Sequence, residues 1–162
     1  MDATAAALLR SLNAQRDHVL GILEGLSDEE LNRPVLPTGW TCLGLVHHLA
    51  LDVERFWFQA VVAGATHAAE ADGETTSAWH VPPGMGAADV LSLYRREIEQ
   101  ANKIIEAVPL EEAPAHWPEF FGSFRLADLR AVLLHVITET ACHAGHLDAV
   151  RELIDGRTWM VL

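Results

Sequence analysis

The amino-acid sequence predicts an all-α protein, a four-helix bundle with long irregular connections. Apolar residues recur at helical spacing in four long segments, and no segment shows the two-residue alternation that is typical of a half-buried strand. Clusters of Pro, Gly, Ser and Thr separate the four segments. With 162 residues, of which 50% are apolar, the chain is long enough for one core, so we expect a single domain over residues 1–162.

The first helix is expected from Thr4 to about Leu26, with an apolar face on one side. Ser27 followed by Glu30 is a capping-box pattern, in which the two residues cap the start of a helix. Because Pro34 follows soon afterwards, only a turn or two of helix can form there.

Thr41 is suited to cap a second helix, which we expect over Cys42–Ala63. This segment is apolar nearly all round, so the helix should be deeply buried. The helical period then disappears over residues 64–86. A connection of this length in a compact domain is often functional, and this one carries Trp79 and His80, so it could cover a pocket.

A third helix is expected over Ala87–Ala107, with one apolar face and charged residues in solvent. A second irregular stretch follows. The fourth helix is expected over Ala127–Asp155, and Gly156 is suited to the cap at its end. Four long helices with irregular connections are typical of a bundle.

The net charge of −12 argues against nucleic acid and anionic membranes as partners, because both require a basic surface. No run of about 18 apolar residues is present, and the N-terminus lacks the pattern of a signal peptide. We therefore expect a cytoplasmic protein with a small-molecule partner. Cys42 and Cys142 have no disulfide framework around them, and each is expected to be a reduced, buried small side chain. The sequence leaves the oligomeric state open, a homodimer included.

The fourth predicted helix carries a polar stripe in an otherwise apolar segment. Glu139, His143 and His146 are spaced i, i+4 and i+7, which leaves them within about 60° of one another around the helix axis. His135 lies one turn before Glu139. Burying a carboxylate beside imidazoles is costly unless a cation compensates for it, so we predict a metal site on this helix.

A metal site in a helical bundle also requires ligands from a facing helix, and the second helix offers His47 and His48. Adjacent residues on a helix point about 100° apart, so the two cannot easily enter the same site. The periodicity does not choose between them, because His47 shares a face with Leu43 and Leu51, whereas His48 lies near Asp52.

Two segments resemble motifs of the DinB/YfiT-like family of metal-binding helical bundles, and the likeness extends over almost the whole chain. They are LVHHLA at residues 45–50, between Trp40-Thr41 and Glu54-Arg55, and ETACHAGH at residues 139–146, followed by Arg151-Glu152. The resemblance implies a DinB-like four-helix bundle in which His48, Glu139 and His143 are the metal ligands.

Many relatives carry histidine at the position of Glu139. The glutamate at this position makes the sequence similar to the mycothiol-dependent branch of that family. The branch includes a maleylpyruvate isomerase and mycothiol S-transferases, and the isomerase has a further C-terminal domain that this sequence lacks. The resemblance therefore implies a metal-dependent thiol S-transferase. A low-molecular-weight, mycothiol-like thiol would bind the metal as a thiolate and attack an electrophilic small molecule.

Two imidazoles and one carboxylate favour zinc among the divalent ions, with nickel, iron and manganese left open. His146, Asp148 and Arg151 are candidates for binding the thiol cosubstrate. Other interpretations of these three residues are an ordinary helix exit for His146 and Asp148 and a solvated helix end for Arg151. The alternative functions are a metal-dependent hydrolase that activates water and a non-catalytic bundle whose metal staples the fold or whose pocket senses a ligand.

The remaining histidines and several aromatic residues are expected to be structural. A buried histidine is more often bonded to a backbone carbonyl than to a metal, and large aromatic residues more often fill a core than line a pocket. The histidines in this group are His47, His67, His80, His116 and His135, and the aromatic residues are Trp40, Phe56, Trp57 and Tyr94.

Overall fold

The computed structural model describes residues 2–65 and 77–159. The described residues are mostly helical and contain no strand, which confirms the predicted all-α bundle. In chain order the elements are α1 (Ala3–Ile22), α2 (Asp28–Asn32), α3 (Cys42–His48), η1 (Leu49–Val62), α4 (Ala87–Ala107), η3 (Glu119–Phe121) and α5 (Leu129–Asp155).

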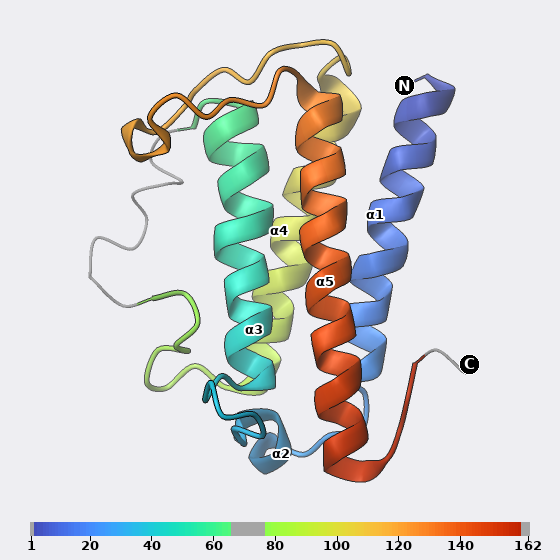
Figure 1. The fold of residues 1–162 in the computed structure, drawn as a ribbon, viewed down its shortest axis with the longest axis vertical. Coiled ribbons are helices and arrows are strands. Elements are labelled where there is room, and N and C mark those ends of the chain that lie inside the picture. The colour runs from blue at the N-terminus through green and yellow to red at the C-terminus, as the bar shows by residue number, and fades with distance from the viewer. Residues whose placement is uncertain (1, 66–76, 160–162) are drawn as a thin grey trace.

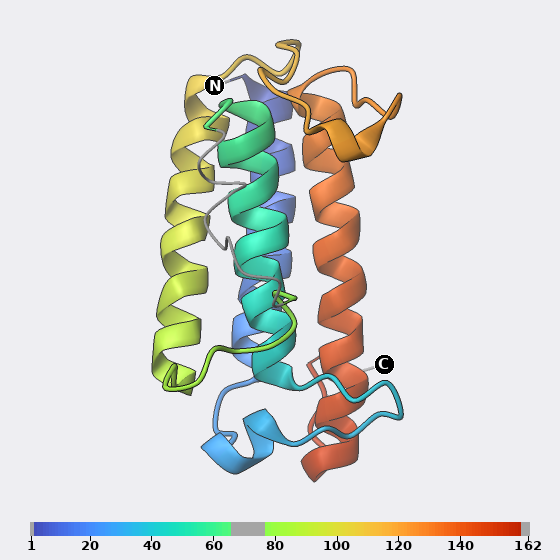
Figure 2. The same cartoon turned by 90° about the vertical axis from the view of Figure 1, so that its left-hand side faces the viewer.

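The long helices lie side by side as a bundle (Figure 1). α3 continues directly into η1, so the two form one rod. α1 and α5 run in one direction, whereas α3–η1 and α4 run in the other (Figure 2). α1 packs mainly on α5, and η1 packs mainly on α4. Because α3 and η1 also contact α5, the helix that carries His48 and the helix that carries His143 face each other inside the bundle.

Side chains at the helix ends confirm several boundaries that the sequence predicts. The Ser27 hydroxyl accepts a hydrogen bond from the Glu30 N–H, and the Glu30 carboxylate accepts one from the Ser27 N–H at 2.8 Å, so the predicted capping box is present. Asp128 caps the start of α5, which begins at Leu129 rather than at the expected Ala127. Gly156, with φ of 79°, ends it in the left-handed conformation that glycine adopts without strain.

The second long helix differs from the α-helix predicted for it. From Leu49 onward its hydrogen bonds follow the i→i+5 pattern of a π-helix, and the N–H of Ala63 donates to the carbonyl of Phe58 at 2.9 Å. The α-helical period of 3.6 therefore stops applying just after His48. The predicted deep burial is confirmed, because every residue of α3 is buried.

The interior is apolar except for a few polar groups, among them an ion pair between two helices. The Arg16 guanidinium on α1 donates from Nε to the Glu54 carboxylate on η1 at 2.7 Å, and both residues are only 1% exposed. A search of the described helices for a stretch long and apolar enough to cross a membrane finds none.

Candidate metal centre

Three side chains from two helices meet between α3 and α5. His48 is the last residue of α3, and Glu139 and His143 lie one turn apart on α5. One ligand-type atom from each residue lies within 4.8 Å of those of the other two, and His48 Nε2 is 3.8 Å from Glu139 Oε1. The structure thus brings together the three residues that the resemblance implies as ligands, in a group that could hold a metal ion.

A carboxylate behind His48 orients its ring. His48 Nδ1 lies 2.8 Å from Asp52 Oδ2 on the next turn of the helix. A carboxylate accepts hydrogen bonds, so Nδ1 donates, and in the neutral imidazole the lone pair is then on Nε2. Carboxylates in this position fix the tautomer and ring orientation of metal-binding histidines. This role of Asp52 was not predicted from the sequence, although its i,i+4 spacing from His48 was a signal for it.

Two buried ring nitrogens in this group have no hydrogen-bond partner among the described residues, namely His48 Nε2 and His143 Nδ1. Burial lowers the pKa of His143 to about 4; His48 also lowers it, and the Glu139 carboxylate acts in the opposite direction. His143 is therefore neutral at pH 7, which is the form that binds a metal. Unpartnered buried polar atoms cost stability, and a cation that accepted their lone pairs would remove that cost.

Trp79, from the connection that precedes α4, covers one side of the group. Its ring stacks on His48, with ring centroids 4.3 Å apart and planes at 15°. It also meets the His143 ring at 64°, with centroids 5.5 Å apart. The connection that was predicted to cover a pocket thus places Trp79 over the ligand group, where the indole shields the two imidazoles on that side.

Two residues of α3 hold the connection in place. His47 Nδ1 lies 2.6 Å from the carbonyl oxygen of Ala78, so His47 has the structural role expected for it. At Gly44 a Cβ would lie 2.3 Å from the carbonyl oxygen of Trp79, which is closer than any side chain permits. Only glycine at this position allows the backbone before α4 to approach α3 and bring the Trp79 indole over His48.

A pocket of about 590 Å³ opens beside the three residues. Its described lining combines aromatic side chains with polar ones, and two of the three clustered residues belong to it. The lining consists of Asp52, Phe56, Trp57, Phe120, His135, Thr138, Glu139, Cys142 and His143.

Four residues around this pocket differ from what the sequence led us to expect. Phe56 and Trp57 are not only core residues, because both line it. Cys142, expected to be buried, is exposed at this pocket. His135 stands outside the three-residue group, but its Nε2 lies 3.3 Å from Glu139 Oε2 rather than on a backbone carbonyl. Helical periodicity shows that a side chain faces inward, but it does not show that the interior is open at that point.

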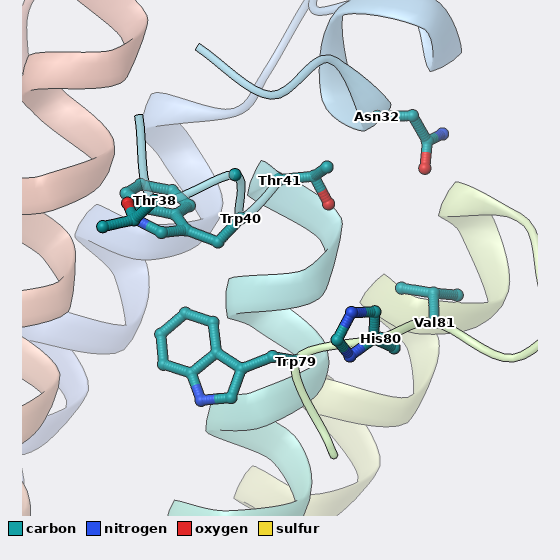
Figure 3. Close-up of a pocket in the computed structure, with 8 residues that line it drawn as sticks. Asn32, Thr38, Trp40, Thr41, Trp79, His80 and Val81 are labelled. Atoms are coloured by element: carbon teal, nitrogen blue, oxygen red, sulfur yellow. The ribbon is translucent and has the colours of Figure 1, made fainter. Parts of the chain in front are cut away.

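A second pocket, of about 420 Å³, lies between the loop before α3 and the connection before α4 (Figure 3). Trp40 and Thr41 line it on one side, and Trp79 and His80 line it on the other. Trp40 and His80 therefore line a pocket, contrary to the purely structural roles expected for them. Trp79 lines this pocket and also stacks on His48, so the indole lies between the second pocket and the metal-ligand group.

The three candidate thiol-binding residues lie in different surroundings. The His146 ring is 5.6 Å from the His143 ring and 6.3 Å from the Trp40 ring, so it lies beside the group. Asp148 Oδ1 lies 2.9 Å from His18 Nε2 on α1, which is a contact between helices.

Arg151 is buried, and its guanidinium donates to the carbonyl oxygens of Ile22 and Glu24 and to the carboxylate of Asp155. The interpretation of Arg151 as a solvated helix end is therefore wrong, because these bonds tie α5 to the end of α1. Of the three candidates, only His146 is brought close to the clustered ligands.

The other residues singled out in the sequence have simple placements. Tyr94 is fully buried in the core, as expected, and His116 is half-buried before α5. His67 lies outside the described residues. Both cysteines are free thiols, and burial raises the pKa of Cys42 to about 11.

Comparison with known proteins supports the resemblance found in the sequence. The comparison with curated proteins gave no match, and neither did the comparison with solved structures. A family model described as mycothiol-S-transferase matches residues 7–156, which is most of the chain. That family description implies a transferase with a thiol substrate. The chain therefore belongs to the mycothiol-S-transferase family.

Proposed function

We propose that this protein is a metal-dependent S-transferase, with His48, Glu139 and His143 as the metal ligands and a mycothiol-like thiol as the nucleophile. The observation that carries the proposal is the approach of three ligand atoms within 4.8 Å of one another, where two buried ring nitrogens lack partners among the described residues. The family match supports thiol transfer as the reaction.

The donor set suits a zinc ion with an open coordination position. Two neutral imidazoles and one carboxylate are ligands that zinc binds, and three protein ligands leave room for a further one. When bound, such an ion lowers the pKa of a coordinating thiol, so that the sulfur reacts as a thiolate at neutral pH. Magnesium and calcium would require more oxygen ligands.

Neighbouring side chains support these ligands. Asp52 accepts the Nδ1 proton of His48 and keeps Nε2 directed at the site. His135 reaches the second oxygen of Glu139 at 3.3 Å and can hold that carboxylate in position. Trp79 excludes water from the side of His48 that it covers. His146, which lies beside His143, is the candidate that we retain for contact with the thiol.

The proposed reaction is a substitution at carbon. The thiol loses its proton to water, and its sulfur forms a bond to the electrophilic carbon. The bond from that carbon to its leaving group breaks, and the leaving group departs with the bonding electron pair. Neither an oxidant nor a reductant is required. We further propose that the protein acts in the cytoplasm, since a reducing compartment suits both a thiol cosubstrate and two free cysteines.

The test is transfer of mycothiol to iodoacetamide by the zinc-loaded protein, measured as thioether formed above the uncatalysed rate. The assay uses the Cys142→Ser protein, because the exposed Cys142 thiol would itself consume iodoacetamide. We expect turnover that a chelator abolishes and that zinc restores. Turnover of an ester or amide without any thiol would contradict the transferase and support a hydrolase.

Matched histidine variants connect this activity to the site. In the same background, His143→Ala should lose both bound zinc and turnover. His116→Ala, at a half-buried histidine outside the group, should keep both. Equal zinc content and equal turnover in the two variants would show that the ligands lie elsewhere.

A further inference from the structure

The lining of the pocket of about 590 Å³ beside the candidate metal centre has two chemically different parts. Glu139 and His143 form one part, and both belong to the clustered ligand group. Phe56, Trp57 and Phe120 contribute aromatic rings to the same lining. The volume falls within the range of about 300–1,000 Å³ that is usual for small-molecule sites. A ligand in this pocket can therefore touch the reacting centre and an aromatic surface together.

The aromatic lining residues contact one another and link η1 to the connection before α5. Phe56 stacks on Phe120 at 29°, with ring centroids 6.0 Å apart. Trp57 meets Phe56 edge to face at 5.5 Å and meets the His135 ring at 4.5 Å. Rings in offset-stacked and edge-to-face arrangements present both faces and edges, which suits a further flat aromatic group.

Phe120 leaves this surface open to solvent. It is 75% exposed although it lines the pocket, so much of its apolar ring has nothing packed on it among the described residues. Covering such a ring with an apolar ligand is favourable, because apolar area leaves water. The neighbouring Phe124 is also exposed, at 47%, but it is not among the residues that line the pocket.

The charges in the pocket select against ions. Asp52 and Glu139 contribute carboxylates, and none of the described lining residues is lysine or arginine. The proposed divalent ion is already balanced by the Glu139 carboxylate and the bound thiolate, so an anionic ligand would find no cationic side chain to pair with, and a cationic head would compete with that ion. An uncharged ligand meets neither penalty.

We infer that this pocket is the electrophile site, and that its substrates are uncharged molecules with a flat aromatic group held by Phe56, Trp57 and Phe120. The inference rests on the proposed function, because the reacting carbon would lie beside Glu139 and His143. It adds the substrate class and assigns Phe120 as a specificity-determining residue.

Two electrophiles with the same reacting carbon test the inference. N-(1-naphthyl)iodoacetamide and iodoacetamide both lose iodide when a thiol sulfur bonds to their methylene carbon, but only the first carries an aromatic group. In the zinc-loaded Cys142→Ser protein, with mycothiol as nucleophile, kcat/KM should be about 10-fold or more higher for the naphthyl compound, after correction for the uncatalysed rates, as expected for several ring contacts. Equal corrected values for the two compounds would overturn the inference while leaving the transferase intact.

Two phenylalanine variants locate the aromatic group. Phe120→Ala should lower the naphthyl preference about 3- to 10-fold, which corresponds to the loss of one ring contact. Phe124→Ala removes an exposed ring of the same connection outside the pocket and should leave the preference unchanged. An equal effect of both variants, or of neither, would overturn the assignment of Phe120.

Binding of an inert analogue separates this inference from the proposed function. N-(1-naphthyl)acetamide has no leaving group, so calorimetric titration of the zinc-loaded protein reports binding alone. We expect saturable binding that Phe120→Ala weakens and Phe124→Ala does not. If this binding were found but neither electrophile were turned over, the proposed transferase and the electrophile role would both fall. If naphthyl binding were absent while iodoacetamide was turned over, only the inference would fall.

Discussion

Two buried polar clusters lie in the same bundle, and they differ in how far the protein satisfies them. Arg16 and Glu54 are paired through two hydrogen bonds, and Arg16 also donates to the side chains of Asn13 and Asn102 at 2.7 Å. In the group of His48, Glu139 and His143, by contrast, two buried nitrogens have no partner among the described residues.

This difference distinguishes a cluster that belongs to the fold from one that can bind a ligand. The Arg16 cluster joins α1, η1 and α4, and its charges are matched inside the protein, so the loss of one partner would leave an uncompensated buried charge. The histidine group leaves lone pairs unused beside a pocket, which is the condition for binding something from outside. Buried hydroxyls of Tyr94 and Thr140 also lack a partner among the described residues, so an incomplete hydrogen bond indicates function only where several ligand atoms gather, as in the histidine group.

Breaking the Arg16 cluster should have the largest effect on stability. Arg16→Met leaves the Glu54 carboxylate buried without a partner, and nothing then offsets the burial that raises the pKa of Glu54. We expect a loss of about 3–5 kcal/mol in the free energy of unfolding, measured by denaturant titration of the metal-free protein. Arg10→Met, at an exposed position of the same helix, should cost less than about 0.5 kcal/mol. Zinc stoichiometry should be unchanged in both variants. Loss of zinc from Arg16→Met would contradict the separate roles of the two clusters.

Removing a member of the group of His48, Glu139 and His143 should change metal affinity instead. His143→Ala removes one of three proposed ligands, and we expect zinc affinity to fall by more than about 100-fold, since even outer partners of ligands contribute about 10–100-fold. Competition with a fluorescent zinc chelator measures the effect. The metal-free variant should be about as stable as the metal-free parent, because the lost imidazole nitrogen has no hydrogen bond among the described residues.

A smaller effect is expected from the residue that orients His48. Asp52→Asn weakens the acceptor for the Nδ1 proton, so zinc affinity should fall about 10-fold without loss of the fold. Asp17→Asn, at an exposed position on α1, is the matched control and should change nothing. If Asp52→Asn bound zinc as tightly as the parent, Asp52 would not orient a ligand.

Cys42 lies in the interior and Cys142 lies at the pocket, so their reactivities compare these two regions without any disruption of the fold. At pH 8 the Cys42 thiol remains protonated, because burial raises its pKa to about 11, and it is 1% exposed. Cys142 is exposed at the pocket. Alkylation of the native protein should therefore modify Cys142 alone, as located by peptide mass spectrometry. Modification of Cys42 at a similar rate would show that the interior opens readily.

The sequence was sufficient to predict where the long helices lie, though not the π geometry of η1, because apolar periodicity, Ser27 with Glu30 and Gly156 are local signals. It could not choose between His47 and His48, since the helix changes to π geometry at Leu49 and the choice depends on contacts with a distant connection. The ligand group itself was accessible through spacing on α5 together with the family resemblance.

The pocket was not predictable in the same way. The connection before α5 contributes Phe120, which joins Phe56 in the pocket lining, whereas the contact of His135 with Glu139 is a local i,i+4 pair on α5. Such long connections carry no periodic signal, so their path follows from tertiary packing and not from a local pattern.

The most direct test of the account is X-ray absorption spectroscopy at the zinc edge of the zinc-loaded protein, before and after addition of mycothiol. The account predicts a first shell of nitrogen and oxygen atoms at about 2.0–2.2 Å that includes two imidazoles, and, after the thiol is added, one sulfur at about 2.3 Å. The Cys142→Ser protein should give the same spectra, which excludes a sulfur from the protein. A shell that contains no imidazole, or one that gains no sulfur when mycothiol is present in excess, would contradict the account.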